Sequence, residues 1–407
     1  MARPRPWLRP MVARDRDEEH RQASWLELFF DLSFVVAVAQ VAVQLEHYLA
    51  EGDVARGVTV YLMVFGAIWW AWVSFTWFAN AFDTDDVPYR LLMMVMIAGS
   101  LGLAAGVPQL AHLDFRIGVI SYVVMRLAYV AQWGRVFRGG DPAWRPVAAK
   151  MIILTTTLQA GWVLFLLVPL DWRIPIFVPL FIIDVAIPIS AGWDARMGGH
   201  RGHIVERYGL FTIIVLGESI AAATIAVGGA IEAQAGSYQL LVLAGGGLIV
   251  VFSLWWIYFD FTTGGAPAGS RSSQYIWGYG HYWLFAAIAA VGAGLALSVE
   301  WLIDHDQLAL PEQGVAMVVG AAVATILLVL MFIESVAERG YARRDVLMKL
   351  VGALWAIGAA LLAPILTVPG SVLLIGLMLA AIVAYGVVLE HRLHVEAKVE
   401  QMSSGHK

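Results

Sequence analysis

The chain has 407 residues, of which 60% are hydrophobic and only 14% are charged, and its formal net charge is −5. A soluble domain averages about 25% charged residues, so this deficit predicts an all-α polytopic membrane protein in contact with a lipid bilayer. The mild charge and the apolar composition argue against a nucleic-acid partner. The chain has no cysteine, which excludes disulfides, Cys–zinc sites, iron–sulfur clusters and thiol catalysis.

The chain begins with a basic tail, residues 1–23, that carries Arg3, Arg5, Arg9, Arg14, Arg16 and Arg21. The apolar run after it is too long for the hydrophobic region of a signal peptide, and no small-residue cleavage site follows. We therefore expect this run to be the first membrane span.

About twelve apolar segments follow the tail, each close to the roughly 20 residues that a bilayer core requires. We predict spans at residues 25–45, 58–80, 89–108, 116–135, 148–168, 174–192, 208–228, 239–259, 281–300, 314–334, 347–366 and 371–390.

The distribution of basic residues predicts the orientation of these spans. With a cytoplasmic N-terminus, all but four of the 26 Lys and Arg residues fall on the cytoplasmic side, the exceptions being Arg56, Arg116, Arg126 and Arg173. Cytoplasmic loops carry an excess of Lys and Arg, so this pattern favours the inner (plasma) membrane with both termini cytoplasmic. Residues 194–207 are then a cytoplasmic linker, and residues 392–407 are a cytoplasmic tail.

The two sets of six spans, residues 24–193 and 208–391, show related features. Acidic residues occur in the first and seventh spans, tryptophans gather in the second and eighth, and small residues fill the third and ninth. Six spans per half would give two six-helix parallel repeats, as in some transporters. Aromatic belts and small residues also recur in unrelated membrane proteins, so the alternative is coincidence.

The first span carries two acids near its start. Glu27 and Asp31 are four residues apart, so they share one face of a helix. A carboxylate in an otherwise apolar span costs a few kcal/mol in lipid, so it normally faces protein or water.

Four ionisable residues are predicted to be intramembrane: Asp31, Arg126, Asp184 and Glu218. The last three lie near the middles of their spans, whereas Asp31 is nearer the cytoplasmic side. A lone buried charge is far more costly than a paired one, so we expect a charge-balanced cluster with Arg126 as the counter-ion. Such a cluster could bind a proton or cation, or it could be a structural network that holds helices together.

Acidic residues also lie in predicted cytoplasmic segments, against the local charge bias. Asp83 and Asp86 lie between the second and third spans, Arg90 lies at the start of the third, and Glu206 and Arg207 precede the seventh. They predict either ion pairs with nearby arginines or a vestibule that attracts cations.

Two further patterns have two interpretations each. His200/His203 and His391/His394 have the spacing of metal ligands, but neither pair has an evident third ligand, so we predict no metal and no other cofactor. The tryptophans could enclose a cation, although belts and packing explain them more often. They include Trp69, Trp70, Trp72, Trp77, Trp255 and Trp256.

Four stretches are distinctive when they are taken together: SWLELFFDLSFVVAVAQ (24–40), FDTDDVPYRLL (82–92), HIVERYGLFTIIVLGESI (203–220) and SLWWIYFD (253–260). They resemble the bacterial low temperature requirement protein A (LtrA) family, named after a growth requirement in the cold. The resemblance implies a polytopic protein of the bacterial plasma membrane, but no substrate or mechanism. By motif position it singles out Glu27, Asp31, Asp83, Asp86, Arg90, Glu206, Arg207, Glu218 and Asp260.

Two functional hypotheses follow. The first is a secondary transporter or ion pathway for a small solute, cation or proton, built around the buried carboxylates. The second is a membrane scaffold or lipid-linked factor that supports growth in the cold, with purely structural acids. No P-loop, dinucleotide fingerprint or nucleophile–base pair is readable, so we do not expect an enzyme.

Overall fold

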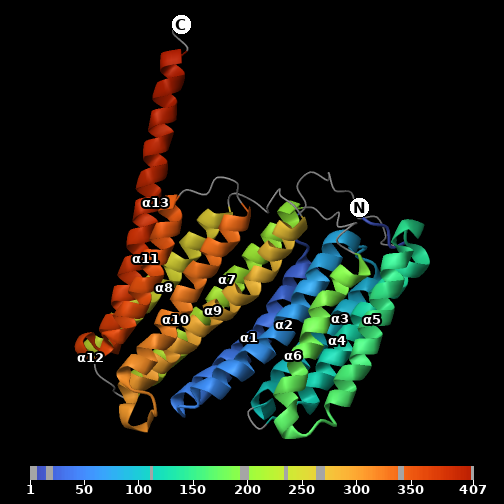
Figure 1. Ribbon diagram of the computed structural model, residues 1–407, viewed down its shortest axis with the longest axis horizontal. Coiled ribbons are helices and arrows are strands. Elements are labelled where there is room, and N and C mark those ends of the chain that lie inside the picture. The colour runs from blue at the N-terminus through green and yellow to red at the C-terminus, as the bar shows by residue number, and fades with distance from the viewer. Residues whose placement is uncertain are drawn as a thin grey trace. The chain divides into compact units, whose positions relative to one another are not determined.

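The computed structural model describes residues 7–14, 22–110, 113–192, 201–232, 237–262, 271–337 and 343–404 (Figure 1). These residues form α-helices and short 3-10 turns, and none of them lies in a β-strand. Eleven of the helices in these ranges are long and apolar enough to cross a membrane. The prediction of a polytopic helical membrane protein is therefore confirmed. Residues 1–6 and 15–21 of the predicted tail, and residues 193–200 around the predicted linker, lie outside the described ranges.

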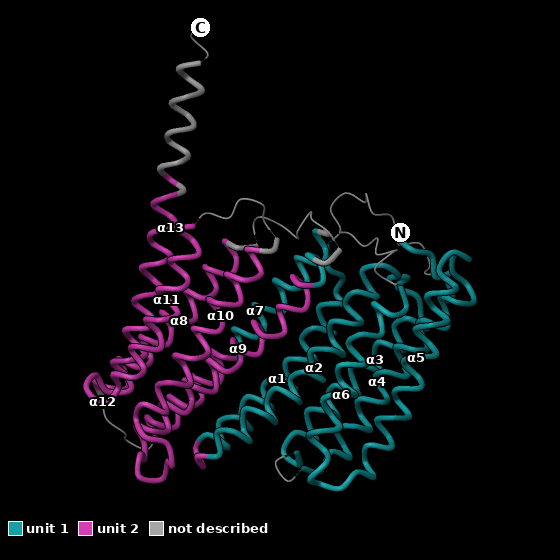
Figure 2. Tube along the Cα trace, in the orientation of Figure 1, with its two compact units in different colours: residues 1–49, 53–218, 265–275 teal, residues 50–52, 219–264, 276–407 magenta. Residues whose placement is uncertain are grey.

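The chain divides into two compact units, shown in different colours in Figure 2. The first unit comprises residues 1–49, 53–218 and 265–275, and the second comprises residues 50–52, 219–264 and 276–407. Helices α7 and α9 therefore contribute residues to both units. The two predicted six-helix halves and their repeat relationship remain predictions.

The N-terminal helices are α1 (Trp25–Ala50), α2 (Val54–Phe82), α3 (Val87–Leu110), α4 (Arg116–Gly139), α5 (Arg145–Phe165) and α6 (Leu170–Ala191). The remaining helices are α7 (Arg201–Glu232), α8 (Ser237–Thr262), α9 (Arg271–Ile303), α10 (Glu312–Ala337), α11 (Arg343–Leu361), α12 (Ala363–Leu366) and α13 (Val368–Ser404). Part of the predicted linker thus forms the first turns of α7, and α13 extends into the predicted C-terminal tail.

Helix α2 lies at the core of the first unit. Large apolar side chains occur on all of its faces, as is typical of a helix surrounded by others. Trp70, Trp72, Phe75 and Phe78 are each at most 1% exposed. Trp70 and Trp72, two of the tryptophans predicted as possible belts or cation boxes in this span, are therefore interior residues.

Small residues allow close helix approach in both units, as is common in membrane proteins. In the first unit, a Cβ atom on Gly106 of α3 would lie 3.0 Å from the backbone nitrogen of Gly118 in α4. In the second unit, a Cβ atom on Gly246 of α8 would lie 2.8 Å from Cα of Leu373 in α13. The crossing at Gly246 requires glycine, and the crossing at Gly106 leaves little room for a Cβ atom.

The predicted eleventh span, 347–366, differs from the other eleven. It corresponds to α11 and α12, and the first seven residues of α11 include Arg343, Arg344, Asp345 and Lys349. Its apolar part is therefore short. Lys349 is not left alone, because its Nζ lies 2.6 Å from Oε2 of Glu334 in α10. Whether α11 crosses the bilayer decides between eleven and twelve spans, and twelve remains the prediction.

Candidate functional site

Two groups of buried charges lie in the first unit. We call the first the Arg126 cluster: Arg126, Asp184, Tyr122, Trp70, Trp162 and Ser74. Arg126 of α4 and Asp184 of α6 are 2% and 0% exposed, and Nη2 of the arginine lies 2.8 Å from Oδ1 of the aspartate. Nη1 of Arg126 donates to the Ser74 hydroxyl of α2 at 2.8 Å.

Asp184 accepts hydrogen bonds from four side chains. Besides Arg126, the indole N–H of Trp70 donates to Oδ1 at 3.1 Å. Oδ2 accepts from the hydroxyl of Tyr122 at 2.8 Å and from the indole N–H of Trp162 at 3.3 Å. The donors come from α2, α4 and α5. A carboxylate with about four lone-pair sites is saturated by this arrangement, which leaves no room for a substrate on it.

Aromatic rings enclose the guanidinium of Arg126. Its Cζ lies 4.9 Å from the ring centre of Tyr129 and 5.9 Å from those of Tyr122 and Trp70. Cation–π contacts of this kind stabilise a desolvated arginine. The Arg126 cluster therefore resembles a structural network that holds four helices together more than an open binding site.

The second group is the Arg207 cluster: Glu27 and Asp31 of α1 with His203 and Arg207 of α7. All four side chains are at most 1% exposed. Arg207 donates from Nε to Oδ2 of Asp31 at 2.8 Å and from Nη2 to the other oxygen. Trp72 of α2 donates its indole N–H to Oδ1 of Asp31 at 2.7 Å. Such bidentate pairs are strong, so Asp31 is held as a carboxylate.

Glu27 connects this cluster to the beginning of α1. The N–H of Ser24 donates to Oε2 of Glu27 at 2.8 Å, and the N–H of Glu27 donates to the Ser24 hydroxyl at 3.2 Å. This reciprocal pair is a capping box, which satisfies backbone donors at a helix start. The other carboxylate oxygen of Glu27 lies 2.9 Å from Nη1 of Arg207.

Glu218 is placed differently from the other predicted intramembrane residues. It lies about 24 Å along α7 from Gly202, near the middle of this candidate span, and it is half-buried. Among the described residues, none forms a hydrogen bond or ion pair with its carboxylate. The expected single cluster is thus divided: Arg126 pairs with Asp184, Asp31 pairs with Arg207, and Glu218 joins neither pair.

The acidic stretch between α2 and α3 forms ion pairs outside the spans. Asp86 is 1% exposed, accepts from the N–H groups of Arg9 and Tyr89 at 2.8 and 3.0 Å, and pairs with Arg135 of α4. Burial raises the pKa of the Asp86 carboxyl, but these two N–H groups and the Arg135 guanidinium more than offset it, so the pKa lies below its ordinary value. Asp86 therefore anchors the N-terminal segment to α3 and α4.

The remaining motif residues have less buried positions. Nη2 of Arg90 lies 2.7 Å from Oδ1 of Asp85, and Arg14 lies 3.6 Å from Oδ2 of Asp83. Asp260 is exposed near the end of α8. His200, of the predicted His200/His203 pair, lies outside the described residues.

A cavity of about 380 Å³ in the first unit is lined by Ser24, Asp85, Arg90 and Glu206 among others. Oε1 of Glu206 accepts from the N–H of Ala23 at 3.4 Å. Ser24 lies three residues before Glu27, and Glu206 directly precedes Arg207. The polar lining of this cavity therefore lies close to the buried charges of the Arg207 cluster. The vestibule that attracts cations remains a prediction for these motif residues.

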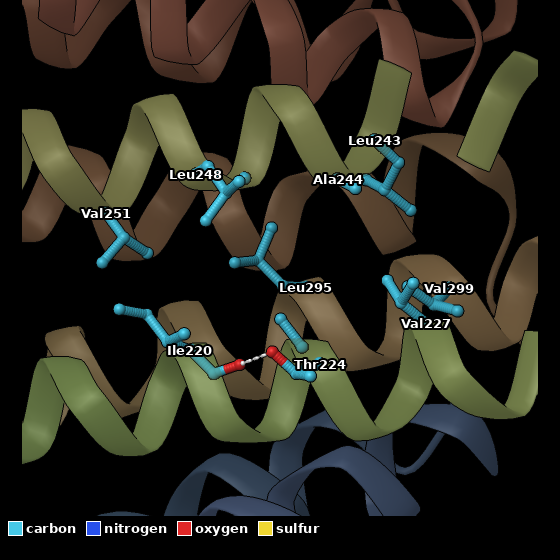
Figure 3. A pocket seen from close by; sticks show the side chains of 11 residues that line it. Ile220, Thr224, Val227, Leu243, Ala244, Leu248, Val251, Leu295 and Val299 are labelled. Atoms are coloured by element: carbon cyan, nitrogen blue, oxygen red, sulfur yellow. Dashed lines mark hydrogen bonds between the residues drawn. The ribbon is translucent and has the colours of Figure 1, made fainter. Parts of the chain in front are cut away.

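The second unit contains an apolar cavity of about 160 Å³ between α7, α8 and α9 (Figure 3). Its lining includes Ile220, Leu248 and Leu295. The hydroxyl of Thr224, which also lines it, donates its proton to the carbonyl of Ile220 at 2.8 Å, so that proton is not available to a ligand. This cavity does not suit a hydrophilic solute.

Comparison with known proteins finds a family match that covers most of the chain. Residues 22–395 match the family model described as bacterial low temperature requirement A protein (LtrA). The chain belongs to the LtrA family. A similar sequence is uncharacterized protein RA0937 of Rhizobium meliloti (strain 1021), which is 26% identical over 318 residues, covering 74% of this chain and 76% of that protein.

Several residues of this LtrA protein contribute to the clusters but are not recognisable as such from its sequence. Trp70, Trp72 and Trp162 are donors to buried carboxylates, and Asn80 contacts His203. The only available signal is that an acid in a span needs donors, and tryptophans on neighbouring spans can provide them.

Proposed function

We propose that this LtrA-family protein is a secondary transporter or ion pathway of the bacterial inner membrane, in which Glu218 takes up and releases a proton. The observation that carries the proposal is the contrast between Glu218 and the three paired intramembrane charges. An ionisable group in a span is costly, and one without a partner among the described residues is not explained by packing.

The paired charges then serve as a framework. Asp184 and Asp31 are each saturated by an arginine and by indole donors, so neither can bind and release a substrate without breaking several hydrogen bonds. Glu218 can change its protonation state without such a loss. Protonation of this carboxyl, coupled to movement of a small solute or cation, is the proposed transport step.

Proton flux in liposomes tests this function. The purified protein is reconstituted with an internal pH-sensitive dye, and a potassium diffusion potential is imposed. We expect flux for the unmodified protein, at least a tenfold loss for Glu218→Gln, and partial retention for Glu218→Asp. Glu232→Gln, at the exposed end of the same helix, is the matched control and should leave flux unchanged. Full flux in folded Glu218→Gln would discard this assignment.

The alternative is a membrane scaffold without transport, in which all of the acids are structural. The saturation of Asp184 by four donors favours it, because such a network needs no solute to satisfy it. The scaffold predicts no flux for the unmodified protein under any tested gradient, together with a lowered melting temperature when a paired acid is neutralised.

We also propose twelve spans with both termini cytoplasmic, arranged as two parallel six-helix repeats. The excess of Lys and Arg in alternate loops supports this orientation. Lys349 and Glu334 neutralise each other, which lowers the cost of placing the start of α11 in the membrane.

A further inference from the structure

The Arg207 cluster contains more buried acid than permanent buried cation. Arg207 always carries its charge, and its bidentate bond holds Asp31 as a carboxylate, so these two charges cancel. Glu27 and His203 remain, and both are at most 1% exposed. If neither carried a titratable proton, the four described side chains of the cluster would together hold a net negative charge away from water, which is strongly unfavourable.

The surroundings of the His203 ring indicate where a proton lies. Nδ1 is 3.0 Å from Oδ1 of Asn80 in α2, and Nε2 is 3.3 Å from Oε2 of Glu27 in α1. Both neighbouring atoms are oxygens that accept hydrogen bonds. A neutral imidazole has only one N–H, whereas an imidazolium has two and satisfies both contacts.

We propose that Glu27 and His203 form a proton-binding site, with His203 as an imidazolium beside a Glu27 carboxylate at neutral pH. The cluster then has two positive and two negative groups and is electrically neutral. This site is distinct from Glu218 and rests on charge balance and geometry, so it does not depend on the proposed transport function.

The other groups around the site are consistent with this count. Among the described residues, the side chains that α2 places against the cluster are the neutral polar groups of Trp72, Thr76 and Asn80. The phenol of Tyr89, on α3, is close enough to Arg207 to interact with it electrostatically. Glu206, the next acid on α7, lines the adjacent cavity and accepts from the N–H of Ala23.

The bound proton would link α1 to α7 and also support the N-cap of α1. Glu27 Oε2 faces both His203 and the N–H of Ser24, which is the N-cap of α1. Loss of the proton would leave this oxygen with its charge uncompensated by the ring. The proton therefore holds the start of α1 against α7, next to a cavity that Ser24 lines.

Nitrogen-15 NMR of the histidine rings tests the proposal on the full chain in lipid. His203→Gln assigns the His203 signals. His281, the matched control, is also 0% exposed, but its Nδ1 lies 2.7 Å from the Trp277 carbonyl and its Nε2 lies 3.3 Å from the Tyr258 hydroxyl, which can donate. At pH 7.5 we expect two protonated nitrogens on His203 and one on His281. A bare ring nitrogen on His203 would overturn the proposal.

Charge-changing variants provide a second, independent test. Glu27→Gln should leave an excess positive charge and His203→Gln an excess negative charge, so each should lower the melting temperature in detergent. The double variant restores neutrality and should melt at a higher temperature than either single variant. If Glu27→Gln alone melts at or above the temperature of the unmodified protein, His203 is neutral and the proposal fails.

Discussion

Nη2 of Arg126 lies 2.8 Å from Oδ1 of Asp184, and the two side chains are 2% and 0% exposed. The pair joins α4 to α6, and the other donors to Asp184 add α2 and α5. Removing one member of a buried pair leaves the other charge without compensation.

Asp184→Asn and Arg126→Met should therefore each lower the free energy of unfolding by about 3–5 kcal/mol. The double variant should lose less than the sum of the two, because the buried charges disappear together. Thermal unfolding in detergent measures all three. Arg116→Met, which disrupts an exposed pair with Asp114, is the control and should change stability by less than about 1 kcal/mol. Strictly additive losses of unfolding free energy would contradict the proposed structural network.

The sequence predicts the spans well because a run of about 20 apolar residues has few alternatives to crossing a bilayer. It also identifies the ionisable residues whose placement in a membrane span is costly, including Asp31, Asp184 and Glu218. It does not predict their pairing. Asp31 and Arg207 are 176 positions apart, and only the packing of α1 against α7 brings them together. A tryptophan in a span can belong to an aromatic belt, pack in the interior or donate a hydrogen bond. The sequence therefore does not predict that Trp72 donates to Asp31.

Acid titration should reveal the contribution of Asp86. Its native pKa lies below its ordinary value, so the native state binds fewer protons than the unfolded state at acid pH. The stability that Asp86 contributes is therefore complete above the unfolded pKa, near 4, and is lost as the pH falls through the native value. The melting-temperature difference between the unmodified protein and Asp86→Asn should be large at pH 6 and shrink below about pH 4.

The exposed residue Asp171 provides the control for this titration. Asp171→Asn should produce a small difference at every pH. A difference for Asp86→Asn that stays constant from pH 6 to pH 3 would show that its carboxylate charge contributes nothing.

Two adjacent glycines in α8 should respond in opposite ways to alanine. A Cβ atom on Gly246 would lie 2.8 Å from Cα of Leu373, whereas nothing lies within 4 Å of a Cβ atom on Gly245. Gly246→Ala should cost about 1–3 kcal/mol through overpacking. Gly245→Ala should be neutral or stabilising by up to about 1 kcal/mol, because alanine favours a helix. Equal effects on thermal unfolding would refute the close crossing of α8 and α13.

The absence of cysteine makes the topology directly testable. Single cysteines at the exposed positions Gly139, Asp171 and His391 can be treated with a membrane-impermeant maleimide in right-side-out vesicles. Twelve spans predict labelling of Asp171→Cys alone. Labelling of His391→Cys together with Asp171→Cys would mean that α11 does not cross, and that the chain has eleven spans.

The central claim is that Glu218 exchanges protons while Asp31 and Asp184 are locked in ion pairs. Dicyclohexylcarbodiimide, an apolar reagent that attaches to protonated carboxyl groups, followed by peptide mass spectrometry, tests it most directly. We expect an adduct on Glu218 at pH 6.5, decreasing at higher pH, with Asp31 and Asp184 unmodified. Modification of Asp31 or Asp184 with Glu218 left untouched would contradict it.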